Sequence, residues 1–490
     1  MGQYRVSIYV LGLVILVVGA AMIVPLLVSL GYGEDDITAI AWSSLITLIS
    51  GAIIAGLTFR RNISREIHHR QAFLIAGMSW VLMGIFGSLP FLFYEVFGPI
   101  SWASFTNSMF ESVSGFTTTG SSVIPHVEGL PHGLLFWRSF SHWIGGLGIV
   151  MLSLAVLPFL GAAGMQLYRT ESSLIPSEKL RPRIIDVARI LWRVYLVLTA
   201  AEILLLVLGK MPLFDSICHT FATVSTGGFS IKDQGIMYYH NSFAEWVIAI
   251  FMVLGGTNFS LLFLLLVGKP RQLLKNGEFR FYLWIIFLGS LFMVLAMYST
   301  GLENTLSTKI RHAFFSIASI SSTTGFSNSD WSAWGSMAKW TIILCLIIGG
   351  CTGSTAGGIR VIRFLVTLKQ HVREGFRLIH PHSVVTTHVG EQVIPRDVLR
   401  SMSGYVILYL FVAFIGTWLI TNLGIAPLDA FSGILASMAN EGPGLGVVGP
   451  MATYASIPLS GKWVFLSWMI IGRVEIFTIL ILLTPEFWRR

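Results

Sequence analysis

Residues 101–125 read SWASFTNSMFESVSGFTTTGSSVIP, and this stretch decides the fold. Its apolar first part is only about half as long as the ~20 residues that a helix needs to cross a bilayer. An apolar segment of that length is typical of a re-entrant helix. Small hydroxyl residues and glycine follow it, as Gly115-Phe-Thr-Thr-Thr-Gly120. We therefore expect a short helix that dips into the membrane and turns back at Gly120.

Three later segments repeat this pattern. They are Pro212–Ser230 with Ser225-Thr226-Gly227-Gly228, Leu306–Asp330 with Ser322-Thr-Thr-Gly325-Phe326, and Pro427–Gly449 with Asn440-Glu441-Gly442-Pro443-Gly444. A second glycine motif lies in the apolar span after each segment, as Ile144-Gly145-Gly146, Leu254-Gly255-Gly256, Ile348-Gly349-Gly350 and Ile471-Gly472-Arg473. Each loop alone would fit a polar extracellular turn. Four copies in phase with the hydropathy pattern indicate one repeated unit.

The composition is that of a membrane protein. Of 490 residues, 54% are hydrophobic and only 11% are charged. Ten full spans are expected, near Ser7–Leu30, Thr38–Phe59, Gln71–Phe97, Leu134–Leu160, Ala188–Gly209, Ser242–Gly268, Phe279–Thr300, Ala338–Ile359, Met402–Leu423 and Lys462–Thr484. Because lipid leaves backbone groups without partners, these spans should be helices.

We predict an all-α polytopic membrane protein in which four repeats, each a helix, a short pore helix and a second helix (M1–pore helix–M2), surround one pseudo-fourfold pore. The expected parts are two extra N-terminal transmembrane helices in 1–70 and pore repeats in 71–168, 169–276, 277–385 and 386–490.

The formal net charge of +8 comes from 32 Lys and Arg against 24 Asp and Glu. The basic residues gather in short segments that alternate with the apolar spans, which is the pattern of the positive-inside rule. These segments, together with both termini, are therefore expected on the cytoplasmic side of a multi-pass protein in contact with membrane lipid. This placement argues against nucleic acid as a partner.

The repeated loops have the chemistry of a cation filter. A potassium ion that sheds its water needs several oxygen ligands of low field strength, which rings of carbonyls and threonine hydroxyls supply. Glycine adopts the positive φ that aims successive carbonyls at one axis. The candidate filter is formed by Thr118, Thr119, Gly120, Ser225, Thr226, Gly227, Thr323, Thr324, Gly325, Asn440, Glu441 and Gly442.

These units and motifs, with Thr-Thr-Gly120, Ser-Thr-Gly227, Thr-Thr-Gly325 and Gly442-Pro-Gly-Leu-Gly446, closely resemble the membrane subunit of bacterial Trk potassium-uptake systems, in the Trk/Ktr/HKT superfamily. The resemblance covers the whole chain. It implies a bacterial inner-membrane homodimer with one pore per protomer, and a cytosolic nucleotide-binding, RCK-type regulatory ring as partner. In that superfamily glycine at the key position of all four loops goes with potassium, and serine in the first loop goes with sodium. Gly120 therefore implies potassium as the transported substrate.

Glu441 departs from this pattern, because an uncharged residue is expected before the fourth glycine. It either bonds behind the filter to the pore helix or adds negative field near the ions. The second alternative would affect how strictly the pore rejects sodium.

A gate is predicted at residues 349–358, where Gly349, Gly350, Gly353, Gly357 and Gly358 interrupt an apolar span. Each glycine costs a helix ~1 kcal/mol relative to alanine, so the span should break. A close-packing kink is the alternative. No lysine follows the glycines as a phosphate loop requires.

Arg473 lies midway along the last span. A lone arginine there costs ~2.5–3.5 kcal/mol on insertion scales, so it should face water, a partner or the pore. Pairing with Glu475 is disfavoured because residues i and i+2 do not face each other on a helix. We expect Arg473 to contact the 349–358 loop and to restrict cation leak, in line with the resemblance.

The cytoplasmic segments Lys369–Arg400 and Arg169–Arg193 are expected to dock the regulatory partner, on family grounds. The histidines at 371, 380, 382 and 388 are too irregularly spaced for a common metal site. No covalent cofactor is expected, and any nucleotide would act through the partner chain.

Two other classes of protein remain as alternatives. A secondary transporter with broken helices would have two inverted halves, whereas four parallel units are read here. An intramembrane enzyme would need a nucleophile–base pair or paired aspartates inside the spans, and no such constellation is found.

Overall fold

The computed structural model describes residues 4–59, 69–156, 180–301, 305–383, 386–390 and 392–489. Helices dominate this part of the chain, and its one small sheet pairs β1 (His388–Val389) antiparallel with β2 (Gln392–Val393). Most of the basic segment predicted between Arg60 and Arg70, the first part of the one between Arg169 and Arg193, and the end of the span predicted at Leu134–Leu160 lie outside the described residues.

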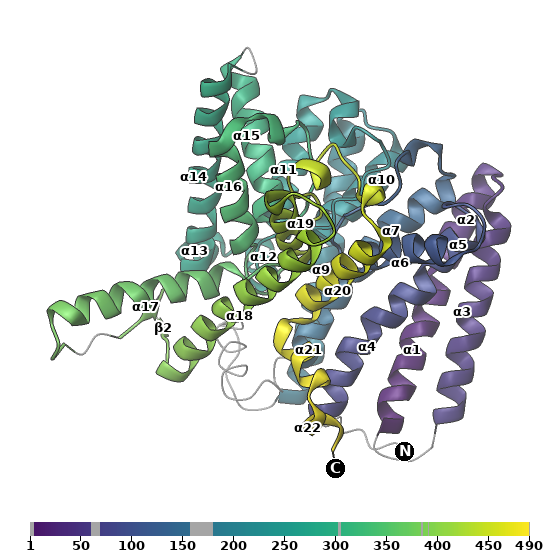
Figure 1. The fold of residues 1–490 in the computed structure, drawn as a ribbon, viewed down its shortest axis with the longest axis horizontal. Coiled ribbons are helices and arrows are strands. Elements are labelled where there is room, and N and C mark those ends of the chain that lie inside the picture. The colour runs from purple at the N-terminus through teal and green to yellow at the C-terminus, as the bar shows by residue number, and fades with distance from the viewer. Residues whose placement is uncertain are drawn as a thin grey trace.

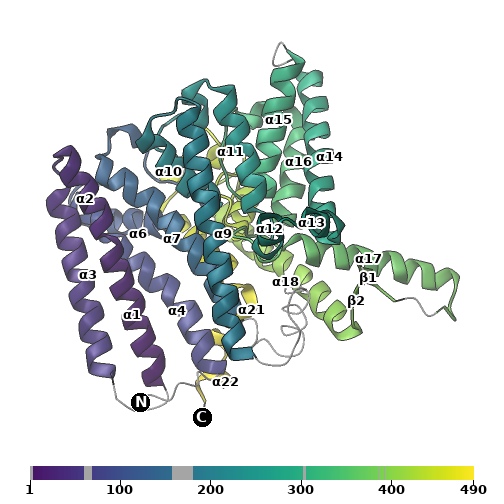
Figure 2. The ribbon, with the colours of Figure 1, turned by 180° about the vertical axis from the view of Figure 1, so that it is seen from behind.

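Two apolar helical segments precede the repeats, as predicted. α1 (Arg5–Ala21) and α2 (Ile23–Tyr32) together form one candidate span, and α3 (Ile37–Thr58) forms the next. The joint at Met22 follows from Pro25, which has no N–H to donate to the carbonyl of Ala21. Figure 2 shows α1 and α3 side by side at the edge of the molecule.

Each of the four gaps predicted to hold a short helix contains one. They are α6 (Trp102–Phe116), α10 (Leu213–Val224), α15 (Leu306–Ser321) and α19 (Pro427–Ala439). Local sequence fixes where they start: Ser101 and Ser104 form a capping box, Thr305 accepts from the N–H of Thr308, and Pro427 is a first helical residue. At 12 to 16 residues these helices are too short to span a bilayer.

Longer helices flank the short ones. Those before them are α4 (His69–Gly87) with α5 (Leu89–Phe93), α9 (Leu180–Leu208), α14 (Gly277–Thr300) and α18 (Arg396–Thr421). Those after them are α7 (His132–Val156), α11 (Ser242–Gly255) with α12 (Phe259–Leu266), α16 (Gly335–Ile348), and α20 (Leu459–Val474) with α21 (Ile476–Leu483). The remaining helices are α13 (Pro270–Lys275), α17 (Val361–Ile379) and α22 (Pro485–Trp488).

Three of the predicted spans are not continuous helices. The chain bends by 113° between α11 and α12, and by 110° between α20 and α21. α16 ends at Ile348 because Gly349 takes a φ of 72°, and Glu475 has a φ of 69° at the second bend. By length and composition the described residues hold six candidate spans, or up to eight if each bent pair counts as one. The total of ten spans stays a prediction.

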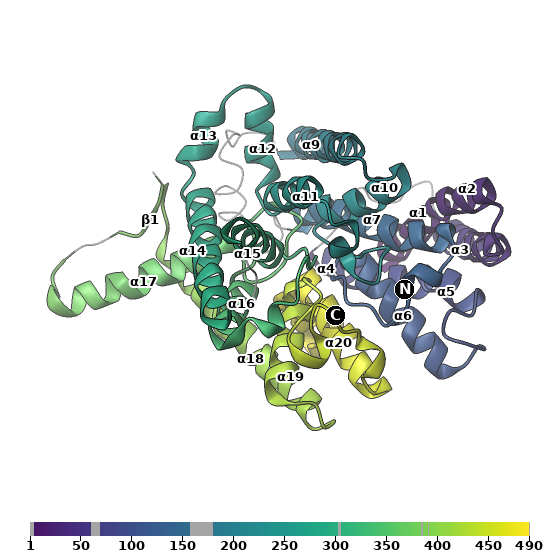
Figure 3. The ribbon, with the colours of Figure 1, turned by 90° about the horizontal axis from the view of Figure 1, so that it is seen from above.

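The four short helices follow one another around a common centre. Seen from above, α6, α10, α15 and α19 lie in successive sectors (Figure 3). α20 packs against α6, so the last helices of the chain contact the first short helix. This arrangement brings the ends of the four short helices into the middle of the molecule.

The outer surface of the bundle is apolar. On α14, the side chains of Trp284, Phe287, Leu291 and Leu295 are each 45–59% exposed. A row of exposed aromatic and aliphatic side chains of this kind suits contact with lipid. The high share of hydrophobic residues in the sequence, 54%, is thus explained by a bundle that is apolar both inside and outside.

α17 extends sideways from the bundle, with the β1–β2 hairpin beside it (Figure 1). The two chain ends lie together, since the rings of Tyr4 and Trp488 have centroids 6.2 Å apart. The cytoplasmic placement of both termini stays a prediction.

Candidate functional site

All four short helices end in the same hydrogen-bond pattern. In α6 the N–H of Thr118 donates to the carbonyl of Gly115 (3.0 Å) and that of Thr119 to the carbonyl of Ser114 (2.9 Å). The same two bonds recur as Thr226 to Thr223 and Gly227 to Ala222, as Thr323 to Ile320 and Thr324 to Ser319, and as Asn440 to Ser437 and Glu441 to Ala436. This is the Schellman arrangement, which satisfies the last helical carbonyls and turns the chain sharply.

The residue that turns the chain has a left-handed backbone in every loop. Thr118, Thr226, Thr323 and Asn440 have φ values of 53°, 54°, 57° and 54°. β-Branched residues rarely adopt this conformation, because the side chain crowds the backbone. Three such threonines at matching positions are the kind of strain that clusters at functional sites.

A glycine with positive φ follows two residues later in each loop, and this corrects the predicted register of the second loop. The glycines are Gly120 (84°), Gly228 (80°), Gly325 (84°) and Gly442 (101°). Gly228, not Gly227, therefore matches Gly120, and Ser225-Thr226-Gly227 is one residue out of phase with the other triplets. Because Gly227 and Gly228 are consecutive, the sequence pattern could not show which of them matches Gly120.

The four glycines lie against one another in a closed ring. A Cβ atom at Gly120 would collide with the carbonyl oxygen of Gly227, one at Gly228 with that of Thr324, and one at Gly325 with that of Glu441. A Cβ atom at Gly442 would lie 2.6 Å from the carbonyl oxygen of Thr119, which returns to the first loop. The carbonyls in this ring all come from the position before the glycine. The loops are thus together at one centre, not on separate outer turns.

Side chains behind this ring differ between the loops. Thr119 Oγ1 contacts Thr117 Oγ1 at 2.8 Å, and Thr324 Oγ1 contacts Ser322 Oγ at 2.7 Å. In the second loop the side chain is missing at Gly227, and the buried ring of His142 fills that space. The sequence gave His142 no such role.

Glu441 occupies this same position in the fourth loop. Its side chain is buried, and neither carboxylate oxygen has a hydrogen-bond partner among the described residues. The first alternative, a hydrogen bond from Glu441 to the pore helix, is therefore not made within the described residues. The alternative, a negative field near the ions, stays a prediction.

The glycine-rich segment 349–358 forms a loop beneath the four ends. It leaves α16 at Gly349 and enters α17 after Arg360, which has a φ of 82°. The hydroxyl oxygen of Thr355 lies 3.2 Å from the carbonyl oxygens of Val224 and Gly255, which share its one proton, and 3.2 Å from Thr226 Oγ1. The N–H of Gly357 donates to Thr323 Oγ1 at 2.8 Å, and a Cβ there would collide with the carbonyl of Ala439. The loop therefore contacts the ends of three short helices.

Other contacts fix the outer part of this loop. The N–H of Cys351 donates to the carbonyl of Gly256 at 2.9 Å, and the N–H of Phe259 donates to the carbonyl of Gly353 at 3.0 Å. The N–H of Thr352 donates to a carboxylate oxygen of Glu278 at 2.7 Å. The loop is thus tied to the break between α11 and α12. Sequence reasoning missed Thr355 and Glu278, although Thr355 stands inside the glycine motif.

Arg473 contacts the loop, as predicted. Its Nη1 donates to the carbonyl of Thr355 at 2.9 Å, and its Nη2 donates to the carbonyl of Gly145 at 3.3 Å. Glu475 instead pairs with Arg363, at 2.8 Å between Oε1 and Nη2. The buried guanidinium thus joins the loop to α7, in the first repeat.

The second glycine motif lets helices approach the short helices closely. A Cβ at Gly145 would collide with the carbonyl of Phe116, and one at Gly472 with the carbonyl of Met438. Phe116 and Met438 each lie two residues before the left-handed residue, Thr118 and Asn440. The paired glycine motifs of the first and fourth repeats are therefore two sides of one contact, whereas Gly349 meets the carbonyl of Gly357 within its own loop.

Within the described ranges, no group of three or more His, Cys, Asp and Glu side chains has the arrangement of a metal site.

Comparisons with known proteins agree with one another. A family model described as "TrkH: Cation transport protein" matches residues 43–489. The chain is 35% identical over 489 residues to "Trk system potassium uptake protein TrkH" of Escherichia coli strain K12, and the match covers 99% of this chain and 100% of that protein. The protein of the same description from Salmonella typhimurium strain LT2 gives the same identity and coverage.

A solved structure is also similar. It is described as the crystal structure of the potassium transporter TrkH from Vibrio parahaemolyticus, with a TM-score of 0.89 and 34% identity. The likeness covers 99% of this chain and 100% of that one.

Proposed function

Because the chain belongs to the TrkH family of cation transport proteins and is not an enzyme, we propose that it takes up potassium through a selectivity filter built from its four pore loops. It is a multi-pass membrane protein of a Trk system, and such a system implies further Trk components. The observation that carries the proposal is the closed ring of Gly120, Gly228, Gly325 and Gly442, each against a carbonyl of the next loop.

Potassium selectivity is supported by the donors around this ring. Backbone carbonyls and threonine hydroxyls offer oxygen ligands without a fixed charge, which lets a cation leave as easily as it enters. Glycine at all four key positions fits the potassium side of the superfamily. The filter residues of the second loop are Thr226, Gly227 and Gly228 in this proposal, one residue later than the sequence pattern gave.

Gating is assigned to the 349–358 loop with Arg473. The loop contacts the inner ends of three short helices, and Arg473 links it to the first repeat. Irregular backbone at membrane depth is tolerated where it is shielded by protein or lines a cavity. A loop with five glycines in this position can move when its hydrogen bonds to the helix ends are broken, which would open the pore.

The proposed assembly is a homodimer in a bacterial inner membrane, with cytoplasmic termini and a cytosolic nucleotide-binding, RCK-type ring. It is supported by α17, which extends from the bundle and exposes Val372, Phe376 and Ile379 on a helix that also carries basic residues. Nucleotide would bind the cytosolic regulatory ring, and only through that partner would it act on the pore.

Growth rescue tests the function. The chain, produced with its partner in a bacterium that lacks potassium uptake, should restore growth in low-potassium medium. Gly120→Ser and Gly228→Ser should reduce this rescue and make it sensitive to sodium, since serine in the filter goes with sodium transport. Equal growth of wild type and both variants, or no rescue by the wild type, would contradict the proposal.

A further inference from the structure

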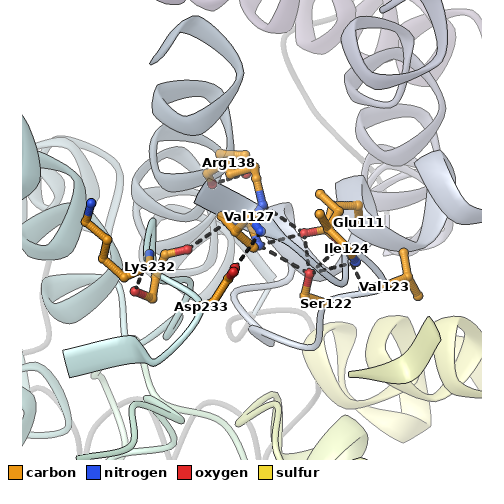
Figure 4. Close-up of polar contacts among 10 residues, drawn as sticks. Glu111, Ser122, Val123, Ile124, Val127, Arg138, Lys232 and Asp233 are labelled. Atoms are coloured by element: carbon orange, nitrogen blue, oxygen red, sulfur yellow. Dashed lines mark hydrogen bonds and ion pairs between the residues drawn. The ribbon is translucent and has the colours of Figure 1, made fainter. Parts of the chain in front are cut away.

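A buried ion pair lies beside the outer face of the ring. Glu111 on α6 and Arg138 on α7 are separated by 2.8 Å between Oε1 and Nη2, with side-chain exposures of 0% and 1%. Figure 4 shows the pair between the chain segments that follow the first and second loops. The two charges neutralise each other, so the pair adds no net charge near the pore mouth.

Glu111 holds the segment that leaves the first loop. Its two carboxylate oxygens accept from the hydroxyl of Ser122 at 3.0 and 3.1 Å, and Oε2 accepts from the N–H of Val123 at 3.0 Å. Ser122 is two residues beyond Gly120. A carboxylate at this point fixes the direction in which the chain leaves the ring.

Arg138 extends the connection to the second loop. Its Nη1 donates to the carbonyl of Ser230 at 2.9 Å, and its guanidinium lies 4.2 Å from the ring centroid of Phe229. Its Nη2 also donates to Ser122 Oγ at 3.3 Å. Ser230 is two residues beyond Gly228, the position that Ser122 has after Gly120. The arginine therefore ties matching points of neighbouring loops.

An acidic residue stands at the position of Glu111 in the first short helix only, since the third has Ser316 there. This position lies seven residues before the left-handed residue and is Glu111 in the first short helix and His219 in the second. The Nε2 atom of His219 lies 3.2 Å from Ser230 Oγ. In the fourth it is Gly433, and a Cβ on Gly444 would lie 2.9 Å from its nitrogen, so backbone packs directly on backbone. The residue two positions beyond the ring glycine is thus held by a charged side chain in the first loop (Ser122) and by backbone packing in the fourth (Gly444).

These contacts frame the outer cavity above the ring. A cavity of about 120 Å³ there is lined by Gly120, Ser122, Arg138, Gly228 and Ser230, among others. An ion must pass this space to reach the carbonyl ring. Arg138 and its two serine partners join the first and second loops beside this cavity, and the N–H of Val127, which donates to Asp233 at 2.6 Å, joins the same two segments farther along the chain.

We propose that Glu111 and Arg138 are positioning residues that set the spacing of the first two loops at the pore mouth and thereby the discrimination between potassium and the smaller sodium ion. This inference rests on the proposed function. Oxygen cages discriminate between cations by the number and arrangement of their ligands, so a loop that shifts should admit sodium. Lysine keeps the charge of Arg138 but lacks the fork that bonds Glu111, Ser122 and Ser230 together.

The test compares Arg138→Lys and Glu111→Gln with wild type in proteoliposomes that contain purified protein. Rubidium uptake and its inhibition by sodium are measured. Both variants should lower the preference for rubidium over sodium by about tenfold, which corresponds to the loss of one hydrogen bond to a charged group. Glu34→Gln is the matched control, because Glu34 also bonds α7, at His132, but away from the pore mouth. It should leave the preference unchanged.

Size-exclusion profiles and melting temperatures separate this role from a merely structural one. Variants that melt earlier but keep the wild-type ion preference would overturn the proposal. If Arg138→Lys does not fold, Ser122→Ala removes one hydroxyl of the network and should still lower the preference, and an unchanged preference there would equally overturn it. Wild type that takes up no rubidium would instead refute the proposed function.

Discussion

At the scale of single residues, the backbone of the loops is more informative than their side chains. Thr118, Thr226 and Thr323 have a left-handed conformation that costs on the order of 1–3 kcal/mol each. The Schellman bonds at each helix end and the contacts around the ring hold them there. The strained conformation turns the chain so that the carbonyls after it face the centre of the ring.

The two glycines of the second loop should differ in a testable way. Gly228→Ala places a methyl group against the backbone carbonyl of Thr324 and strains a φ of 80°, so potassium uptake should be lost. For Gly227→Ala the nearest atoms are instead those of the His142 side chain. Adding His142→Ala should therefore restore uptake to Gly227→Ala but not to Gly228→Ala, as measured by rubidium uptake.

His142→Ala alone is the control for this experiment. It should retain most uptake, because the ring nitrogens have no hydrogen-bond partner among the described residues. Rescue of Gly228→Ala, or failure to rescue Gly227→Ala, would show that the structural register is wrong.

At the scale of elements, the 349–358 loop is held by few side-chain hydrogen bonds, and Thr355 makes three of them. Thr355→Val keeps the shape but leaves two buried carbonyls with fewer donors. We expect it to destabilise this loop arrangement by about 1–3 kcal/mol, a shift of about 5- to 150-fold in the ratio of open to closed pores. Rubidium leak in the absence of the regulatory partner should rise accordingly.

Thr352→Val is the matched control in the same loop. The hydroxyl of Thr352 faces Glu278, to which the N–H of Thr352 also donates, and it makes no hydrogen bond to the end of a short helix. This substitution should leave the leak at the wild-type level. Equal leak in both variants would mean that the hydroxyl of Thr355 does not hold the loop.

At the scale of the whole molecule, closure of the ring depends on contacts between the last repeat and the first. Lys462 on α20 donates to Asn107 Oδ1 on α6 at 2.9 Å and to the carbonyl of Ala455 at 3.0 Å. Trp463 Nε1 donates to Thr106 Oγ1 at 3.2 Å. The bonds of Lys462 to Asn107 and of Trp463 to Thr106 join residues more than 300 positions apart in the chain.

Lys462→Met should lower the free energy of unfolding by about 1.5–3 kcal/mol, the value of a hydrogen bond to a charged group. Thermal or denaturant unfolding of the purified protein in detergent measures this. Asn107→Ala should give a loss that is not additive with the first, since the two residues share one bond. Additive losses would indicate that the contact does not stabilise the closure.

Much of the element content could be predicted because its signals are local. Apolar segments of full and half length distinguished the long helices from α6, α10, α15 and α19. The bends at Gly256–Asn258 and at Glu475 were missed, because their flanking segments, Ser242–Gly268 and Lys462–Thr484, are apolar enough to read as single spans. The break at Gly349 was expected, since five glycines within ten residues disfavour a helix.

Periodicity and hydropathy were enough to predict a helical membrane protein with four repeated loops, because each repeat carries its own copy of the signal. The contact of Arg473 with the glycine-rich segment was expected from the family resemblance. The three-dimensional structure was needed to show that Gly228 is the member of the ring from the second loop, that His142 fills the space behind Gly227, and that Glu111 and Arg138 join two loops. Those features depend on which atoms meet across distant segments, and nothing in the local pattern of a single segment specifies its neighbours.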